Sequence, residues 1–363
     1  MPETKFPFNP GKVAVRLLDW YGTDGRDLPW RHTRDPYAIW LSEIMLQQTG
    51  VETVIPYYLK FLDQYPTVET LAAAPVEEVI ELWAGLGYYR RARNLHAAAK
   101  VVVSDHAGDF PASLAELQAL PGVGRSTAGA ILSIAFDIPA PILDGNVRRV
   151  LCRLLALHGD PRSSPAEKQL WQWSEALTSE QRPHDYAQAI MDLGATVCTP
   201  RKPACEICPL NELCVAHAEG IAEKLPEGRP KKSLPLRRQV ALILEEYGRM
   251  LVRRRGLDGM LGGLWEFPCL ELGADDKLEP LSQQLAIELG GEGLHALGSV
   301  DHLYSHFRLE VLLYSARRSA DGSRIAEGDD SRWLSYDELQ NLALHGAHRK
   351  AFKKFIEPGK ENS

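Results

Sequence analysis

A cluster of four cysteines constrains this chain more than any other feature of its sequence. The cysteines follow the pattern Cys-x6-Cys-x2-Cys-x5-Cys and are Cys198, Cys205, Cys208 and Cys214. Four thiolates so close in sequence are typical ligands of an iron–sulfur cluster, and Pro203 and Pro209 shape the loops between them. A four-cysteine zinc site is the alternative, but zinc sites usually pair two short Cys-x2-4-Cys knuckles, whereas one is present here. We therefore expect a 4Fe-4S cluster, around which this part of the chain folds.

The composition is that of an ordinary soluble protein. At 363 residues, with 45% apolar and 25% charged residues, the chain is long enough for two or three domains. No apolar run approaches the ~18 residues that cross a bilayer, and the first residues lack the apolar segment of a signal peptide. Six cysteines in a long chain of this kind do not indicate a disulfide framework. We expect a cytoplasmic monomer with no membrane partner.

The hydrophobic pattern changes once along the chain. Residues 11–110 have mostly helical spacing, and alternation of period two is almost absent before residue 238. Strand-like runs follow at 239–246, 249–255 and 306–317. The basic, proline-containing stretch between the two parts predicts a linker at 226–237. The chain is therefore predicted to be multidomain, with an all-α region followed by an α+β domain.

A glycine turn between two helical segments lies within residues 113–147. Ser113, with Glu116 three residues later, predicts the capping box of a short helix. Gly122 and Gly124 can both adopt positive φ, and helical spacing resumes directly after them. A helix that begins at glycines leaves its first N–H groups open to an anion, so a phosphate is the expected ligand. A plain loop between two core helices is the alternative.

Two carboxylates stand where acid–base chemistry could use them. Glu43 lies in a predicted helix, 37–48, among apolar neighbours, and partial desolvation would raise its pKa toward that of a general acid. A solvated glutamate at the rim of the helix is the alternative. Asp144 precedes another helical run, where capping is the commoner use of an aspartate, and Asn146 could cap the same helix.

Residues 84–95 interleave glycines, tyrosines and arginines. The glycines allow close approach to the backbone, Tyr88 and Tyr89 offer faces on which a base could stack, and the arginines offer positive charge. This mixture favours a contact with nucleic acid. A core tyrosine beside a solvated arginine face remains the alternative.

Together, the LPGVG turn at 120–124, Asp144 and the cysteine cluster resemble the helix-hairpin-helix DNA glycosylases of the endonuclease III superfamily. In that family the hairpin grips the DNA backbone, the aspartate serves catalysis and the cluster shapes a loop that touches DNA. The resemblance implies these roles for Gly122 and Gly124, for Asp144 with Asn146, and for the cysteines. It covers an all-α region, which we divide into a helical barrel subdomain with the hairpin and a cluster subdomain. The bounds are 8–225 for the region, 31–134 for the barrel subdomain, and 8–30 with 135–225 for the cluster subdomain.

Within the superfamily the chain is most similar to adenine DNA glycosylases of the MutY type, which remove adenine mispaired with 8-oxoguanine. The segment LPWRHTRDPYAIWLSEIMLQQT resembles their adenine pocket and implies that Glu43 is the catalytic glutamate. Ser126 stands where lyases of the superfamily have the lysine that forms a Schiff base, so we assign it to catalysis and expect no strand cleavage by that route. The other residues expected at DNA are Arg31, Gln48, Thr49, Leu86 and Tyr88.

The segment LGGLWEFP at 261–268 resembles the start of this family's C-terminal Nudix-like domain, predicted here over 238–356. In some members a Phe-Ser-His motif reads 8-oxoguanine. This chain has Tyr304, Ser305 and His306 there, so the resemblance implies a lesion-reading role for the serine and the histidine beside a changed aromatic residue. No Arg-Glu-x-x-Glu-Glu motif is present, so we expect this domain to bind without hydrolysing nucleotides.

The sequence thus predicts a monofunctional DNA glycosylase of base excision repair, associated with the nucleoid through DNA. The expected partner is double-stranded DNA with an adenine opposite 8-oxoguanine or guanine. A bifunctional glycosylase and AP lyase of the endonuclease III type is one alternative. A non-catalytic iron–sulfur protein that binds DNA is another.

Overall fold

The chain forms two compact units, which we describe separately. The computed structural model describes residues 6–228, 233–257, 259–273, 276–319, 328 and 330–357. One unit consists of residues 1–74 and 93–230, and the other of residues 75–92 and 231–363. The predicted linker, 226–237, contains residues 229–232, which lie outside the described residues. Among the described helices, none has both the length and the apolar composition that a bilayer crossing requires.

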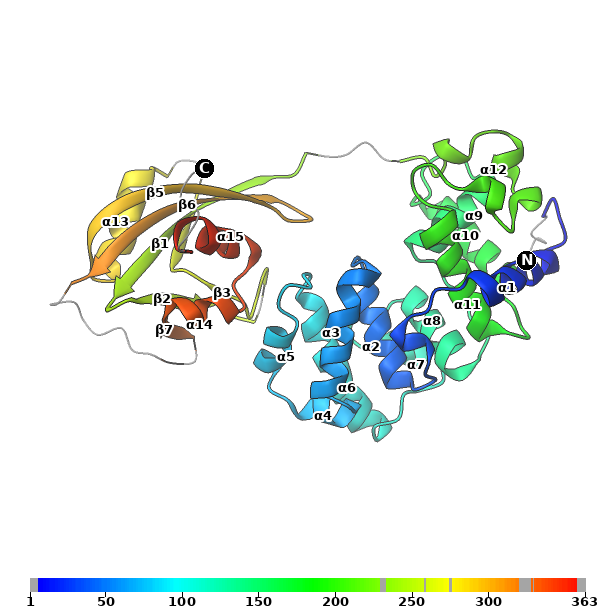
Figure 1. Cartoon of the computed structure of the whole chain (residues 1–363), viewed down its shortest axis with the longest axis horizontal. Helices are drawn as coiled ribbons and strands as arrows, with labels where there is room; N and C mark the ends of the chain where they lie inside the picture. Colours follow the sequence, from blue (N-terminus) through cyan, green and yellow to red (C-terminus); the bar gives the residue numbers. More distant parts are fainter. Residues whose placement is uncertain are drawn as a thin grey trace. The chain divides into compact units, whose positions relative to one another are not determined.

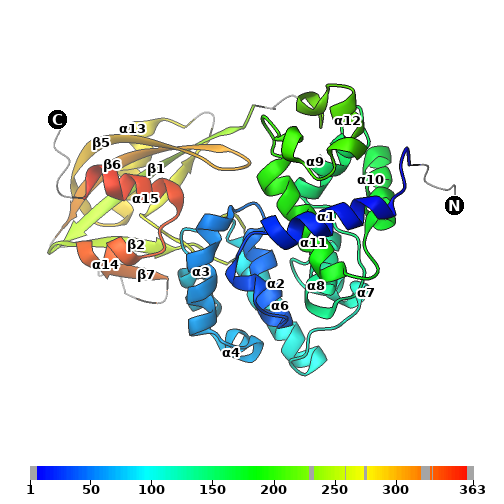
Figure 2. The same ribbon diagram turned by 45° about the vertical axis from the view of Figure 1, so that its right-hand side comes forward.

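The first unit is helical, as predicted (Figures 1 and 2). Its α-helices are α1 (Gly11–Asp24), α2 (Pro36–Leu46), α3 (Val51–Gln64), α4 (Val68–Ala73), α6 (Arg90–His106), α7 (Leu114–Ala119), α8 (Arg125–Phe136), α9 (Gly145–Leu154), α10 (Ser164–Leu177), α11 (Pro183–Asp192) and α12 (Val215–Ala218). Helix α5 (Val76–Leu82) belongs to the segment that groups with the second unit. Short helical turns are η1 (Pro29–Arg31), η2 (Leu193–Val197), η3 (Cys205–Ile207), η4 (Asn211–Leu213) and η5 (Ala222–Lys224).

The core of this unit joins the N-terminal helix to helices far along the chain. Val13 and Leu17 of α1 pack in one cluster with Ile39 of α2 and with apolar residues of α8, α9, α10 and α11. Leu151 of α9 and Leu170 of α10 are completely buried there. Burial of such side chains contributes about 1.5–3 kcal/mol each. This packing fixes α2, α8, α9 and α11 relative to one another.

Helix α2 is almost entirely buried. Asp35 caps its N-terminus by accepting a hydrogen bond from the Tyr37 N–H at 3.0 Å, and Pro36 supplies a preset φ at the first helical position. The helix ends at Leu46, two residues earlier than predicted, because Gln48 has φ of 59°. The chain therefore leaves α2 in a sharp turn beside its buried face.

The predicted glycine turn lies between α7 and α8, but its details differ from the prediction. Gly122 alone has positive φ, 80°, and an added Cβ there would lie 2.8 Å from the Cβ of Asn94. Gly124 is the extended N-cap of α8, and a Cβ there would meet open space. The predicted capping box of α7 is wrong, since the N-cap Ser113 makes no side-chain capping bond.

Within the described residues, the second unit contains a mixed sheet of seven strands, which agrees with the α+β prediction (Figure 1). The strands are β1 (Leu236–Glu246), β2 (Arg249–Arg254), β3 (Trp265–Glu266), β4 (Cys269–Leu272), β5 (Gly291–Leu303), β6 (Arg308–Arg318) and β7 (Ser331–Leu334). The order is β3-β2-β1-β6-β5, with β4 paired to β1 and β7 to β2. Strands β1 and β6 are parallel, and the other pairs are antiparallel. The helices are α13 (Leu278–Glu288), α14 (Tyr336–Asn341) and α15 (Gly346–Phe355).

Helices cover both faces of strand β1. Val240 and Leu242 pack with Leu285 of α13, whereas Gln239 contacts His348 of α15. Because successive residues of a strand point to opposite faces, α13 and α15 lie on opposite sides of it. This two-sided burial explains the continuous apolar run that revealed β1 in the sequence.

Strand β5 was missed by the sequence analysis. It is a long edge strand, mostly exposed or half-buried, and it contains glycines and two irregularities in its register against β6. Its identity as a strand comes from pairing with β6, and no strong apolar alternation marks it in the sequence.

Candidate active site

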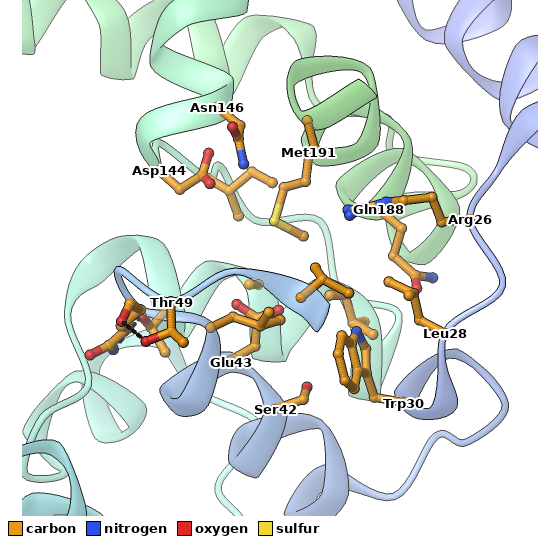
Figure 3. A pocket seen from close by; sticks show the side chains of 18 of the residues that line it. Arg26, Leu28, Trp30, Ser42, Glu43, Thr49, Asp144, Asn146, Gln188 and Met191 are labelled. Carbon is orange, nitrogen blue, oxygen red and sulfur yellow. Dashed lines mark hydrogen bonds between the residues drawn. The ribbon is translucent and has the colours of Figure 1, made fainter. Parts of the chain in front are cut away.

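A cavity of about 590 Å³ lies in the helical unit. Its walls come from the segment before α2, from α2 itself, from α8, from the start of α9 and from α11. Figure 3 shows Asp144, Asn146 and Met191 on one side, with Glu43, Ser42 and Trp30 facing them. The cavity therefore brings together the two carboxylates that the sequence singled out, although they are a hundred residues apart.

Glu43 is held on α2 at the wall of this cavity. Burial and, to a smaller extent, the negative charge of Asp144 raise the pKa of its carboxyl to about 7, although Arg31 acts in the opposite direction. Loss of hydration disfavours the charged form, so near neutral pH a large share of Glu43 is protonated. A carboxyl in this state is suited to donate a proton.

Asp144 both caps a helix, which confirms the capping interpretation, and lines the cavity. Its Oδ1 accepts a hydrogen bond from the Val147 N–H at 2.7 Å, at the N-terminus of α9. Burial raises the pKa of the Asp144 carboxyl, while hydrogen bonds from the backbone of Val147 and Asn146 and the charge of Arg149 act in the opposite direction. The helix N-terminus thus favours the negative form of Asp144 in a place otherwise unfavourable to charge.

Ser126 lies in the first turn of α8 and also lines the cavity. Its Oγ accepts a hydrogen bond from the Leu143 N–H at 3.0 Å. This bond ties α8 to the residue directly before Asp144. The hydroxyl therefore holds the backbone that positions the carboxylate, a role that the sequence did not reveal.

Arg31 and Arg26 share one buried carboxylate at the edge of the cavity. Asp192, at the end of α11, is fully buried and accepts hydrogen bonds from both guanidinium groups, including one of 2.8 Å from the Arg26 Nε. Arg31 also donates to the Arg26 carbonyl at 2.7 Å. The expected contact of Arg31 with DNA stays a prediction, because its side chain is only 8% exposed.

Several residues of the cavity were missed by the sequence analysis. They are Arg26, Trp30, Gln47, Gln188 and Met191. Gln188 is 3% exposed, and its side-chain amide contacts His184 Nε2 at 2.8 Å. Helix α11 buries three polar residues, Gln188, His184 and Asp192. Because buried polar side chains need hydrogen-bond partners, these residues among the apolar ones of the helix were the sequence signal that could have indicated a site.

The residues expected at DNA lie in several places. Thr49 lines the cavity, and Gln48 beside it is exposed. Tyr88 is 40% exposed. Leu86 is buried, so mainly the backbone of Leu86 is left for the expected contact with DNA. Gln48 and Tyr88 have φ of 59° and 51°, a left-handed conformation that is uncommon for residues other than glycine. Such strain persists where the surrounding structure requires it and is frequent at functional sites.

The four predicted cysteine ligands converge on a small cavity after α11, together with Arg153. Among the described residues, the groups of three or more candidate ligand atoms lying within 4.8 Å of one another do not include these sulfurs. A single zinc ion with ~2.3 Å bonds needs its sulfurs about 3.8 Å apart, so the wider arrangement fits a cluster better. Burial, together with the charges of the neighbouring cysteines and against a hydrogen bond from the Leu210 backbone, raises the pKa of the Cys208 thiol to about 12, so it is metal binding that would deprotonate this group.

Two arginines of α9 hold the cysteine loop, and one of them, Arg149, also lines the cavity of Glu43 and Asp144. Arg149 donates to the Cys198 carbonyl at 2.7 Å and to Asn146 Oδ1 at 2.8 Å. Arg153 is 2% exposed, and it donates to Cys198 Sγ at 3.3 Å and to the Thr199 carbonyl at 2.7 Å. The position of Asn146 therefore depends on the fold of the cysteine loop.

In the second unit, Ser305 and His306 occupy the exposed tip of the turn between β5 and β6. The Tyr304 N–H donates to the Phe307 carbonyl at 2.9 Å, which closes this turn. The side chains of Ser305 and His306 are both exposed, and the Ser305 hydroxyl also donates to the Tyr88 hydroxyl at 3.1 Å.

Comparison with known proteins supports this arrangement. Residues 41–176 match the model of the HhH-GPD superfamily of base excision DNA repair proteins, residues 198–214 the iron–sulfur binding domain of endonuclease III, and residues 239–354 the NUDIX domain. These matches confirm the predicted fold classes and the iron–sulfur assignment of the cysteines.

The similarity to full-length relatives covers most of the chain. An adenine DNA glycosylase of Rattus norvegicus is 39% identical over 94% of this chain and 77% of its own length. One from Buchnera aphidicola subsp. Acyrthosiphon pisum is 34% identical over 93% of this chain and 96% of its own length. Among solved structures, a thermostable thymine-DNA glycosylase is 35% identical with a TM-score of 0.53, and covers 58% of this chain and 97% of the other.

Proposed function

Because the chain belongs to the adenine DNA glycosylases of base excision repair, we propose that it hydrolyses the N-glycosidic bond of adenine opposite 8-oxoguanine or guanine, without cutting the strand. One observation carries this proposal: Glu43 and Asp144 face one cavity, and the carboxyl of Glu43 has a pKa of about 7. Two carboxylates in unlike environments can act as acid and as charged partner in the cleavage of a glycosidic bond. We expect a monomer acting on nucleoid DNA in the cytoplasm.

In this mechanism Glu43 donates its proton to N7 of the adenine. Protonation makes adenine a better leaving group, because the electrons of the breaking bond then neutralise a positively charged base, which departs as neutral adenine instead of as an anion. The target adenine must leave the helical stack to reach Glu43, and the cavity of about 590 Å³ is large enough for a purine. Gln48 and Tyr88, both exposed and in left-handed conformations, are the residues expected to fill the vacated place in the duplex.

Asp144 acts on the sugar. Its negative form stabilises the positive charge that develops on the deoxyribose as the bond breaks, or traps the sugar covalently before water completes hydrolysis. Asn146 and the N-terminus of α9 hold the carboxylate, and the Ser126 hydroxyl holds the backbone before it. Removing any of these supports should affect the rate through Asp144.

The hairpin and the cysteine loop are proposed to hold the DNA. The N-terminus of α8 has no side-chain cap, and the space beside Gly124 is open, so its N–H groups can donate hydrogen bonds to a backbone phosphate. When bound by the four cysteines, a 4Fe-4S cluster would hold the loop in its folded form. Ser305 and His306 are proposed to read the 8-oxoguanine on the opposite strand.

A glycosylase assay tests this function. Duplexes with A:8-oxoguanine, A:G and A:T pairs would be incubated with the protein, and products analysed before and after alkali. We expect adenine release from the first two duplexes, with strand breaks only after alkali treatment. Strand breaks without alkali would instead support the bifunctional lyase, and no base release would support the non-catalytic alternative.

Ser126 gives a direct test of the distinction from a lyase. Among the described residues that line the cavity there is no lysine, so a Schiff base with the sugar lacks its amine. We expect Ser126→Lys to gain strand-cleaving activity, detected as a DNA adduct trapped by sodium borohydride. A Ser126→Met variant of similar bulk serves as the control and should give no adduct. Failure to trap an adduct with the folded lysine variant would contradict the proposed position of Ser126 beside the sugar.

A further inference from the structure

The turn that carries Ser305 and His306 is built on an aromatic stack. The rings of Tyr304 and Phe307 lie 4.7 Å apart at an interplanar angle of 17°, and the His302 ring contacts Tyr304 edge-on at 4.3 Å. Phe307 is buried, whereas Ser305 and His306 are exposed. The orientation of the exposed pair therefore depends on how firmly Tyr304 is held.

The hydroxyl of Tyr304 makes two hydrogen bonds to the start of helix α15. It lies 3.0 Å from His345 Nδ1 and accepts from the Ala347 N–H at 3.1 Å. His345 is the N-cap of α15 and makes no side-chain capping bond of its own, so Tyr304 satisfies one of the N–H groups that the helix leaves open. The tyrosine thus joins the turn to the helix through an atom that phenylalanine lacks.

His345 is itself fixed by partly buried charged groups. It is 1% exposed, and its Nε2 lies 3.2 Å from Glu266 Oε2, which also accepts from Arg255 Nη1 at 2.6 Å. With the Nε2 proton donated to Glu266, Nδ1 is left as the acceptor for the Tyr304 hydroxyl. Burial would raise the pKa of Glu266, but His345 and Arg255 lower it below its usual value. A connected chain of polar groups therefore runs from Arg255 to the turn.

A metal site in the same place is excluded by the hydrogen bonds. Glu266, His345 and His348 have ligand atoms within 4.8 Å of one another. However, His348 Nδ1 accepts from the Phe267 N–H at 2.8 Å, and its Nε2 contacts Gln239 at 2.6 Å. With the nitrogens of His345 also engaged, both imidazoles already use the atoms that would bind a metal.

We propose that Tyr304 and His345 are positioning residues that fix the Ser305–His306 turn, and so set the preference for adenine opposite 8-oxoguanine over adenine opposite guanine. This inference rests on the proposed lesion-reading role of the turn. It also explains the replacement of phenylalanine by tyrosine at position 304, because His345 and the Ala347 N–H provide partners for the added hydroxyl.

The first test measures the turn without reference to activity. Amide hydrogen exchange of the full chain with its cluster would be compared for wild type, Tyr304→Phe and Tyr336→Phe. Tyr336 is a matched control, since it belongs to the same unit and stacks on Phe352 of α15. We expect exchange in the peptide covering 303–308 to be about fivefold faster in Tyr304→Phe and unchanged in Tyr336→Phe. Equal exchange in both variants would overturn the inference.

The second test measures specificity. In Tyr304→Phe, the ratio of single-turnover rates on A:8-oxoguanine and A:G duplexes should fall about five- to tenfold at limiting enzyme concentration. The loss should appear as weaker binding of the A:8-oxoguanine duplex, with the rate at saturating enzyme retained, because the catalytic residues lie in the other unit. A lower rate at saturating enzyme, with unchanged binding of the A:8-oxoguanine duplex, would contradict the positioning role.

Two substitutions of His345 separate its two nitrogens. The amide oxygen of His345→Asn can take the place of Nδ1 and accept from Tyr304, whereas His345→Gln reaches toward Glu266. We expect His345→Asn to keep most of the preference and His345→Gln to lose it. The reverse order would overturn the link through Nδ1.

Ser305→Ala and His306→Ala distinguish failure of this inference from failure of the lesion-reading proposal. If both variants keep the wild-type preference, the turn does not read the lesion, and hydrogen exchange alone decides whether Tyr304 and His345 fix it. If either variant loses the preference while Tyr304→Phe keeps it, the positioning inference is wrong.

Discussion

Replacing Glu43 with glutamine is expected to lower the single-turnover rate of adenine excision at least about a thousandfold, which is within the range of general acid catalysis. Glutamine keeps the shape of the side chain, but its amide cannot give up a proton as a general acid near neutral pH. Affinity for DNA containing an A:8-oxoguanine pair should change no more than about severalfold, because other residues are proposed to contact the duplex. Rates would be measured with enzyme in excess, and affinity by a gel-shift or anisotropy assay.

Two controls accompany Glu43→Gln: its melting temperature and a matched variant at the same cavity. Glu43 is held on α2 in a place that disfavours its charge, so Glu43→Gln should melt at the same temperature as the wild type or slightly higher. Glu52 also lines the cavity, on the following helix, and Glu52→Gln is the matched variant that should retain activity within about threefold. Normal excision by folded Glu43→Gln would remove this residue from the mechanism.

The pKa of Glu43 also predicts how the rate depends on pH. A general acid must be protonated, and burial raises the pKa of Glu43 to about 7. The rate should therefore decrease as the pH rises through this value. An unperturbed glutamate, with a pKa of about 4.3, would be ionised throughout the neutral range, and the decrease would occur well below neutrality.

The second large effect is expected at Asp192, whose carboxylate is fully buried between Arg26 and Arg31. Asp192→Asn keeps the volume but removes the charge, leaving two guanidinium groups close together without their common partner. Breaking a buried pair in this way costs about 3–5 kcal/mol. We expect a loss of this size in the free energy of unfolding of the helical unit, measured by urea denaturation followed by circular dichroism.

The pH dependence of this loss has a definite sign. Burial alone would raise the pKa of Asp192, but hydrogen bonds and charge from Arg31 and Arg26 lower it below its usual value. A carboxyl with a lowered pKa stabilises the fold above the pKa of the unfolded chain, about 3.9, and this contribution is lost as the pH falls through the folded value. The difference in free energy of unfolding between wild type and Asp192→Asn should therefore be constant near neutral pH and become smaller as the pH falls into the acid range.

Asp185 on the same helix is the matched control. It pairs with Arg182, which is 54% exposed, at 2.7 Å. Exposed pairs contribute about 0–1 kcal/mol, so Asp185→Asn should change stability by no more than this. Equal losses for the two variants would show that Asp192 has no special role.

Without Asp192, the charge of Arg31 should also lower the pKa of Glu43. The decrease of the excision rate with rising pH should then occur at a lower pH.

Local features of the sequence determined the fold class, the cysteine ligands and several candidate site residues. The spacing of Cys198, Cys205, Cys208 and Cys214 indicates an iron–sulfur site because ligands close in sequence need only a short loop to meet. The apolar neighbours of Glu43 indicate a desolvated carboxyl because helix periodicity fixes which residues surround it. The glycine turn before Arg125 likewise indicated the start of a helix, because the geometry of a turn depends on residues adjacent in sequence.

The tertiary structure decided the features that depend on distant parts of the chain. Arg26 and Arg31 meet Asp192 across more than 160 residues, and neither the arginines nor the aspartate carries a local mark of this partnership. Strand β5 is defined by its pairing with β6, and the hydroxyl of Tyr304 is explained by His345, which follows it by 41 residues. Local sequence therefore predicts helix periodicity and short ligand loops, whereas the partner of a buried charge or of an edge strand is set by the packing of the whole domain.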